Sequence, residues 1–305
     1  MSIIVPSDWR RAGLVIATLS LLILSMPACS VAAQIEYEPS APIEYEPVAA
    51  NIAFSEVAAL PVRQPDARIA YGSDVLQVGL LWLPTVDTGD TGTDARAPVV
   101  ILIHGGCWLN AYDITHTYAL STALAQAGYA VWSLEYRRTG DTGGGWPGSF
   151  NDIMAGTRHL QALGDHAVDT DRFVIAGHSA GGHLALLAGR ETPTASAVLG
   201  LAAITDINAY AAGSNSCETA TPLFMGGTPQ ERPDAYHDAN PSAHPAHANT
   251  VLLHGADDTL VPVNQALMVG ARTLFVESGG HFDWVHPGTR SFRVLLSTLQ
   301  SVLPQ

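Results

Sequence analysis

The sequence contains no lysine: all 14 of its basic residues are arginine. This absence excludes several kinds of site, since a P-loop, a pyridoxal Schiff base and a Ser–Lys dyad all require a lysine side chain. Basic charge of any kind is scarce, and the formal net charge is −14 over 305 residues. A protein that binds nucleic acid needs a basic surface to displace counterions, so nucleic acid is not an expected partner.

The N-terminal residues have the pattern of a secretory signal peptide. Arg10 and Arg11 precede an apolar run that ends at Met26 and is followed by small residues. This run is short for a membrane span, and the pattern is typical of a segment that is removed on export. We therefore expect residues 1–33 to be a signal peptide and the protein to be periplasmic, in the cell envelope or secreted. A second interpretation stays open, because the tetrapeptide that ends at Cys29 is similar to a lipobox, which makes Cys29 a candidate lipid anchor.

Residues 34–60 are acidic and rich in proline and alanine, and they contain the pentapeptide Ile-Glu-Tyr-Glu-Pro twice, at 35–39 and 43–47. Proline, repulsion between like charges and a shortage of apolar residues all oppose a compact fold. We therefore expect a disordered linker over 34–60, ahead of a single domain over residues 61–305.

Within this domain short apolar runs alternate with helical stretches. Pro98–Ile103 is continuously apolar, as expected for a strand that is buried on both faces. Strands that are separated by helical crossovers form a mostly parallel sheet with helices on both faces, an α/β fold. Residues 205–248 interrupt the alternation with many prolines and glycines, and we expect them to form a small cap insertion. The other expected strands are 129–134, 172–176, 197–202, 250–254 and 273–276, and the expected helices are 118–127, 151–163, 292–302 and one that begins after residue 179.

The most specific motif is Gly-His-Ser-Ala-Gly at residues 177–181, between a predicted strand and a predicted helix. A tight turn from strand to helix needs small residues beside the serine, and it exposes the serine oxygen near the free N–H groups of the helix start. We therefore predict that Ser179 is a catalytic nucleophile. A plain glycine turn between two elements is the alternative interpretation.

A second motif, His-Gly-Gly-Cys-Trp at residues 104–108, follows another predicted strand. Glycines let a backbone approach a reacting carbonyl closely, and the negative charge on its oxygen needs preorganised N–H donors. We expect an oxyanion hole in which one N–H comes from Gly105, Gly106 or Cys107 and the other comes from Ala180.

The side chains around this loop have further expected roles. We expect His104 to brace the loop by hydrogen bonding. Trp108 is expected either to pack inside the domain or to contact a substrate. Tyr136 and Trp146 are candidates for a pocket wall opposite the cap insertion.

The two motifs together resemble those of the esterase, lipase and aryl-formamidase branch of the α/β-hydrolases, which is related to the hydrolase domain of prolyl oligopeptidase. Glu-Tyr-Arg-Arg at 135–138, Gly-Gly-Gly-Trp-Pro-Gly at 143–148 and Asp152 are similar to further blocks of that branch. The resemblance runs from about Arg68 to the C-terminus. It implies the α/β-hydrolase fold and acyl transfer to water, and it does not imply a particular substrate.

In this fold the catalytic acid and base follow the nucleophile in the order Asp, His. The loop 255–262 contains two aspartates, and the spacing usual in the family favours Asp258, with Asp257 as the alternative. After the last predicted strand, a glycine-rich loop contains His281, the expected base, with His286 as the alternative. A buried aspartate would orient the histidine and stabilise its charged form during catalysis.

Only three cysteines are present. Removal or lipidation of Cys29 leaves Cys107 and Cys217 in the exported domain, and an even pair in an oxidising compartment indicates a disulfide. The alternative is that both are buried thiols that pack as small apolar side chains.

The leading hypothesis is a serine hydrolase that cleaves a small carboxylic ester, with no cofactor and no metal. An amide hydrolase, either an aryl formamidase or an exported peptidase, is the alternative because both reactions pass through the same oxyanion. A third hypothesis is a non-catalytic surface protein on a hydrolase scaffold. The cap also contains His237, Asp238, His244 and His247, but no regular helix fixes their spacing and a zinc site is disfavoured.

Overall fold

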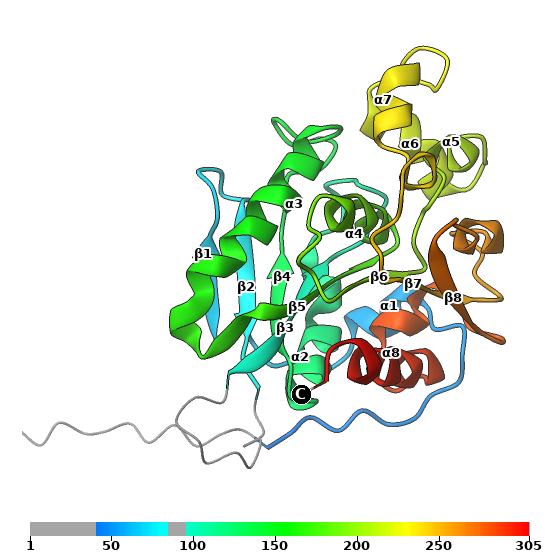
Figure 1. Cartoon of the computed structure of the whole chain (residues 1–305). Helices are drawn as coiled ribbons and strands as arrows, with labels where there is room; N and C mark the ends of the chain where they lie inside the picture. Colours follow the sequence, from blue (N-terminus) through cyan, green and yellow to red (C-terminus); the bar gives the residue numbers. More distant parts are fainter. Residues whose placement is uncertain (1–40, 85–95, 305) are drawn as a thin grey trace, which may run out of the picture. The chain divides into compact units, whose positions relative to one another are not determined.

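The structure, a computed structural model, describes residues 41–84 and 96–304. Eight strands form one sheet in the order β1-β2-β4-β3-β5-β6-β7-β8 (Figure 1). β2 is antiparallel to both of its neighbours, and the pairs from β4 to β8 are all parallel. Parallel strands end at one edge of the sheet, so the loops after β3, β5, β7 and β8 gather there. The strands are β1 (Ala67–Ala70), β2 (Val78–Trp82), β3 (Ala97–Ile103), β4 (Ala130–Leu134), β5 (Val168–His178), β6 (Ala197–Leu201), β7 (Thr250–Gly255) and β8 (Ala271–Val276).

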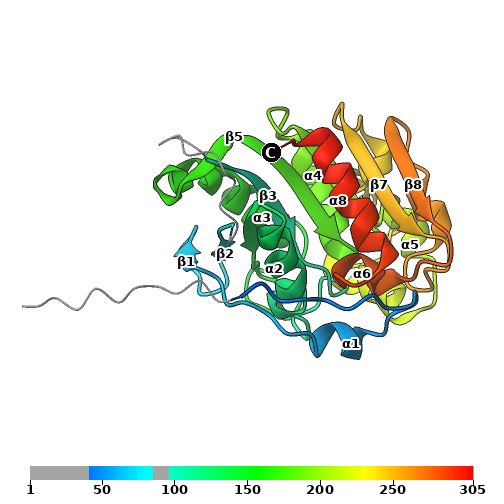
Figure 2. The same ribbon diagram turned by 90° about the horizontal axis from the view of Figure 1, so that it is seen from below.

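Helices cover both faces of the sheet (Figures 1 and 2). α3 (Gly148–His159) and α4 (Ala180–Arg190) lie on one face, and α2 (Tyr118–Gln126) and α8 (Arg290–Val302) lie on the other. The central strands are apolar because both faces are covered, and one large cluster of buried apolar side chains lies on each side. The predicted α/β fold is therefore confirmed.

The cap insertion lies between β6 and β7 and is built from short helices, beside α4 in Figure 1. Asn215 begins the longest of them, because its side chain accepts hydrogen bonds from the N–H groups of Cys217 and Glu218. The helices are α5 (Ile207–Tyr210), α6 (Ser216–Met225), α7 (Pro233–Asp238) and the 3₁₀ turn η3 (Pro241–Ala243).

Residues 41–60, which we call the N-terminal arm, differ from the predicted disordered linker. Their helix α1 (Phe54–Ala58) packs on the domain, and Ile52 is buried. The carboxylate of Asp283 accepts hydrogen bonds from the N–H groups of Asn51 at 3.1 Å and of Ile52 at 2.9 Å. These partners lie more than 200 residues away in sequence, so the local composition does not reveal them. The folded domain therefore includes the arm.

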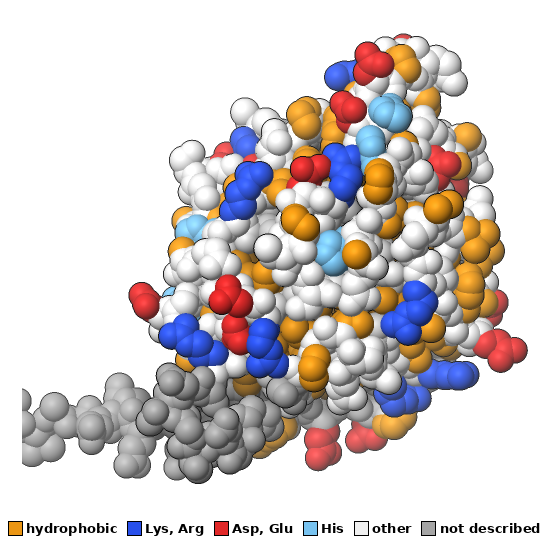
Figure 3. All heavy atoms as spheres, in the orientation of Figure 1, with side chains coloured by type: hydrophobic (Ala, Val, Ile, Leu, Met, Phe, Trp, Pro, Cys, Tyr) orange, Lys and Arg blue, Asp and Glu red, His pale blue; other side chains and the backbone are white. Residues whose placement is uncertain are grey.

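The predictions about export concern residues that the structure does not describe. The signal peptide over residues 1–33 and the candidate lipid anchor Cys29 both lie outside the described ranges. Among the helices of residues 41–84 and 96–304, none is long and apolar enough to cross a bilayer. On the face shown in Figure 3, arginine and acidic side chains are interspersed with apolar ones.

A buried histidine links α4 to the cap insertion. The Nε2–H of His183 donates to the carbonyl oxygen of Ala239 at 2.7 Å, and the ring lies against Trp108 and Phe224. Burial lowers the pKa of His183 to about 4, although its hydrogen bond to Ala239 acts in the opposite direction. His183 is therefore neutral in the folded protein at neutral pH.

Acid should destabilise the fold through this histidine. In the unfolded chain a histidine takes up its proton near pH 6.5, whereas His183 stays neutral in the folded state until about pH 4. Its contribution to stability is thus complete above about pH 6.5 and falls as the pH drops, by about 2 kcal/mol between pH 7 and pH 5. Urea unfolding at the two pH values measures this loss. His183→Gln should reduce the pH dependence by that amount.

Candidate active site

Ser179 lies at the sharp turn between β5 and α4. Its backbone has φ 58° and ψ −122°, a strained conformation for a residue other than glycine. The turn is possible because small residues surround it: a Cβ atom on Gly177 would lie 2.2 Å from the carbonyl oxygen of Gly181. The N–H of Ser179 donates to the carbonyl of Leu201 on β6 at 2.8 Å, which fixes the turn to the sheet.

Asp258 and His281 come together from the loops that follow β7 and β8. The Nδ1–H of His281 donates to Oδ2 of Asp258 at 2.8 Å. The other carboxylate oxygen accepts hydrogen bonds from the N–H groups of Leu260 at 2.9 Å and Val261 at 2.8 Å. Since Nδ1 carries the proton in this pair, Nε2 of a neutral His281 is free to accept one.

The environment of Asp258 favours its ionised form. Burial raises the pKa of Asp258, but the charge and the hydrogen bond of His281, together with the Val261 N–H and nearby His254, outweigh this and hold the pKa below its ordinary value. A carboxylate that stays charged keeps its partner histidine oriented with Nδ1 protonated.

The alternative acid and base lie elsewhere. Asp257, the neighbour of Asp258 in sequence, is exposed. His286 is buried, and its Nδ1 accepts a hydrogen bond from the N–H of Gly288 at 3.1 Å. Neither side chain takes part in the contact between Asp258 and His281.

Three segments of the predicted site meet around His178. Its Nε2–H donates to the carbonyl oxygen of His281 at 2.9 Å, and the two rings are 4.7 Å apart. A Cβ atom on Gly105 would lie 2.8 Å from the His178 carbonyl oxygen and 3.1 Å from Cβ of Ser179. The structure therefore brings the serine turn, the histidine loop and the glycine loop together.

The loop 104–108 presents backbone N–H groups beside Ser179. Gly106 has φ +108°, a left-handed conformation that suits glycine. Among the described residues, the N–H groups of Gly105, Gly106 and Ala180 have no hydrogen-bond acceptor. Unpaired donors on both sides of a serine are what an oxyanion hole requires.

Side chains hold this loop rigidly. His104 donates from Nδ1 to the Gly105 carbonyl at 2.8 Å and contacts Glu135 through Nε2 at 3.0 Å, so it braces the loop as expected. The Tyr136 hydroxyl donates to the His104 carbonyl at 3.0 Å, and Tyr136 is fully buried, so its role is to support the loop. Trp108 is also fully buried and stacks on Phe224 with ring centres 4.7 Å apart. Of the two roles considered for Trp108, the structure thus favours packing.

A disulfide joins Cys107 in this loop to Cys217 at the start of α6, with Cα atoms 4.9 Å apart. The bond ties the predicted oxyanion loop to the cap insertion. Their 110-residue separation in sequence makes the closed loop long. In the chain-entropy account, closing a loop of this size removes freedom chiefly from the unfolded chain.

Loss of this disulfide should destabilise the protein by about 5 kcal/mol, less any relief of native strain. Reduction of the purified protein and the double variant Cys107→Ser/Cys217→Ser should both lower the melting temperature. Thermal unfolding with and without reductant measures the effect, and the double variant should no longer respond to reductant. Two free thiols in denatured, unreduced protein would contradict the bond.

Two of the cap histidines, His237 and His244, lie together with ring centres 5.0 Å apart. His244 Nε2–H donates to the His237 carbonyl oxygen at 3.0 Å, a contact with the backbone. Within residues 41–84 and 96–304, no group of three or more His, Cys, Asp or Glu side chains is placed to hold a metal ion.

Comparison with known proteins identifies the family. Residues 89–272, more than half of the chain, match the family described as BD-FAE. The chain belongs to the BD-FAE family. This BD-FAE member is 28% identical over 222 residues to Esterase LipC of Mycobacterium tuberculosis. The aligned region covers 65% of this chain and 52% of LipC. It therefore spans about half the length of that relative.

Two solved structures share the fold of this BD-FAE member. A truncated carbohydrate esterase from gut microbiota has a TM-score of 0.64 at 20% identity, covering 80% of this chain and 98% of that one. Esterase B from Lactobacillus Rhamnosis has a TM-score of 0.63 at 19% identity, covering 82% and 89%. Both likenesses identify the fold as that of the α/β-hydrolases.

Proposed function

We propose that this protein is a serine hydrolase that cleaves a small carboxylic ester, with Ser179, Asp258 and His281 as its catalytic triad. The observation that carries the proposal is the 2.8 Å contact between His281 Nδ1 and Asp258, beside a serine held at a strained turn between strand and helix. No metal and no cofactor is required for this chemistry.

In the proposed mechanism, Nε2 of His281 accepts the Ser179 hydroxyl proton as Oγ attacks the ester carbonyl carbon. Negative charge develops on the carbonyl oxygen, where the N–H groups of Gly105, Gly106 and Ala180 would stabilise it. Collapse of this intermediate breaks the bond to the alcohol, which takes the proton from His281. A water molecule then gives its proton to His281 and attacks the acyl-enzyme, and the acid leaves with Ser179 restored.

The relatives support an ester as the substrate. LipC and both solved structures carry esterase names, and LipQ and LipM of Mycobacterium tuberculosis are named as an esterase and a probable carboxylic ester hydrolase. An amide would pass through the same oxyanion, so amide hydrolysis by an aryl formamidase or an exported peptidase is the alternative that experiment must separate.

A substrate panel tests the proposal. The protein should hydrolyse aryl esters such as p-nitrophenyl acetate faster than aryl formamides and peptide amides, and Ser179→Ala should be inactive on all of them. Faster turnover of the formamide or of a peptide amide would favour the alternative. Absence of turnover on every substrate by folded protein would favour a non-catalytic surface protein.

We also propose that the protein is exported. The signal-like residues 1–33 and the oxidised pair Cys107–Cys217 support an oxidising compartment. The intact mass of the mature protein tests this, because cleavage after Ala33 starts the chain at Gln34, whereas lipidation leaves a diacylglycerol on Cys29. An unprocessed N-terminus at Met1 would contradict both forms.

A further inference from the structure

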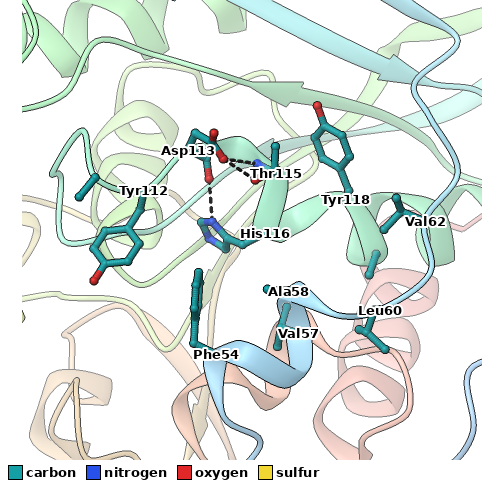
Figure 4. Close-up of a pocket in the computed structure, with 12 residues that line it drawn as sticks. Phe54, Val57, Ala58, Leu60, Val62, Tyr112, Asp113, Thr115, His116 and Tyr118 are labelled. Atoms are coloured by element: carbon teal, nitrogen blue, oxygen red, sulfur yellow. Dashed lines mark hydrogen bonds between the residues drawn. The ribbon is translucent and has the colours of Figure 1, made fainter.

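A cavity of about 480 Å³ lies between the N-terminal arm and the segment that leads into α2 (Figure 4). One wall is apolar and comes from the arm, with Val57 and Leu60 among its side chains. The facing wall includes Asp113, His116 and Tyr118. The cavity has the size of a pocket that holds a small molecule or a substantial part of one.

Two polar groups of the facing wall, the Asp113 carboxylate and the His116 Nδ1–H, already have hydrogen-bond partners. Asp113 caps the 3₁₀ turn η1 (Ile114–Thr117) by accepting a hydrogen bond from the Thr115 N–H at 3.0 Å. His116 donates from Nδ1 to the Asp113 carbonyl at 2.7 Å, and burial lowers the pKa of His116 to about 4. The ring is therefore uncharged at neutral pH. Such a pocket suits an apolar occupant better than an ion.

Phe54 of α1 connects this cavity to the candidate active site. Figure 4 shows Phe54 on the cavity wall, beneath His116 and beside Tyr112. Its ring centre lies 5.8 Å from that of Tyr112 and 5.5 Å from that of Phe282, the residue that follows His281.

Two residues that Phe54 contacts, Tyr112 and Phe282, in turn contact residues of the proposed catalytic site. Tyr112 packs against the glycine loop, because a Cβ atom on Gly106 would lie 2.5 Å from Cβ of Tyr112. The Phe282 ring lies 5.0 Å from the ring of His281. Phe54 thus stands between the cavity on one side and the proposed base and oxyanion loop on the other.

We propose that this cavity binds an apolar group of the ester substrate, an aliphatic chain or an aromatic ring, and that Phe54 is a specificity-determining residue. The proposal rests on the proposed ester hydrolysis. It adds a binding site for the part of the substrate that the triad does not select. It also assigns a function to the N-terminal arm, because the arm forms one wall of the pocket. The apolar group can belong to the acyl part or to the alcohol part of the ester.

Two substrate series distinguish these sources. In the first, p-nitrophenyl esters run from acetate to octanoate, so that only the acyl chain grows. In the second, the acyl part is always acetate, and the alcohol part grows from methyl to hexyl and benzyl. Hydrolysis in this series is measured by pH-stat titration. The wild type should prefer a larger group in at least one series, and that series identifies which part of the ester enters the pocket.

Three variants test the role of the arm. Phe54→Ala removes the shared wall, and Ala58→Phe fills the cavity from an exposed position on the same helix. Both should lower the ratio of kcat/KM for the preferred large ester to kcat/KM for the acetate by about tenfold, because a poorer fit in an apolar pocket affects the large group more than the small one. Ser55→Ala, on the exposed side of α1, should change neither rate.

The outcomes separate this inference from the proposed function. Equal ratios of large-ester to acetate activity in the wild type, Phe54→Ala and Ala58→Phe would overturn the pocket while leaving the esterase proposal intact. Absence of activity on every ester in folded wild type would overturn the esterase proposal itself. If Phe54→Ala does not fold, as judged by thermal unfolding, Ala58→Phe decides alone, since it adds a side chain at an exposed position.

Discussion

Alanine in place of Ser179 should lower the rate of ester hydrolysis by on the order of 10⁶-fold, to a level that is hard to detect. The reason is that the remaining groups act as a unit: His281 has no hydroxyl to deprotonate, and no acyl-enzyme can form. Hydrolysis of a p-nitrophenyl ester and covalent labelling by a fluorophosphonate both report the loss.

Ser278→Ala is a matched control for this change. Ser278 also has a positive φ, of 57°, but it lies exposed in the loop after β8 and not at a turn from strand to helix. Its variant should keep activity and labelling. Substantial turnover by pure, folded Ser179→Ala would remove Ser179 from the proposed triad.

Asparagine in place of Asp258 should lower kcat by about 10⁴-fold, the size of effect known for triad aspartates generally. Asp258 accepts the Nδ1–H of His281, and its low pKa keeps it charged. An asparagine amide can present an N–H to the ring in its place, which turns the histidine to the wrong tautomer and removes the charge that stabilises its protonated form.

Asp257→Asn provides the comparison, since it makes the same chemical change one residue away at an exposed position. Its kcat should stay within a few-fold of the wild type. Steady-state kinetics of both variants, with thermal unfolding to establish that each is folded, measures the difference. A reversed ranking would assign the acid to Asp257.

Much of the candidate site could be predicted because its chemistry needs particular residues at fixed places in the chain. A serine turn tolerates only small neighbours, so Gly177 and Gly181 mark it in the sequence. The order of acid and base then leaves few choices, and the structure brings Asp258 and His281 into contact. The choice between Asp257 and Asp258 depended on family spacing, because two adjacent aspartates offer the same chemistry.

The edge of the fold was less predictable. Strands β1 and β2 were not predicted from the sequence. β2 is short and pairs antiparallel with its neighbours, so no helical crossover marks it in the sequence. The arm was expected to be disordered on composition, and its order depends on Asp283, whose carboxylate holds two N–H groups of distant residues. The apolar residues Ile52, Phe54 and Val57 favoured an ordered segment. The prediction of disorder instead followed the proline and acidic residues nearby. Tertiary contacts of this kind cannot be recognised from local sequence alone.

The bond between Cys107 and Cys217 has a topological consequence. The closed loop contains Ser179, while Asp258 and His281 lie outside it on the C-terminal side. A protease that cuts once anywhere between the two cysteines therefore leaves both fragments covalently attached. Such a nicked molecule would migrate as one species without reductant and as two with it, and it would still hold its serine on the same covalent framework as its aspartate and histidine.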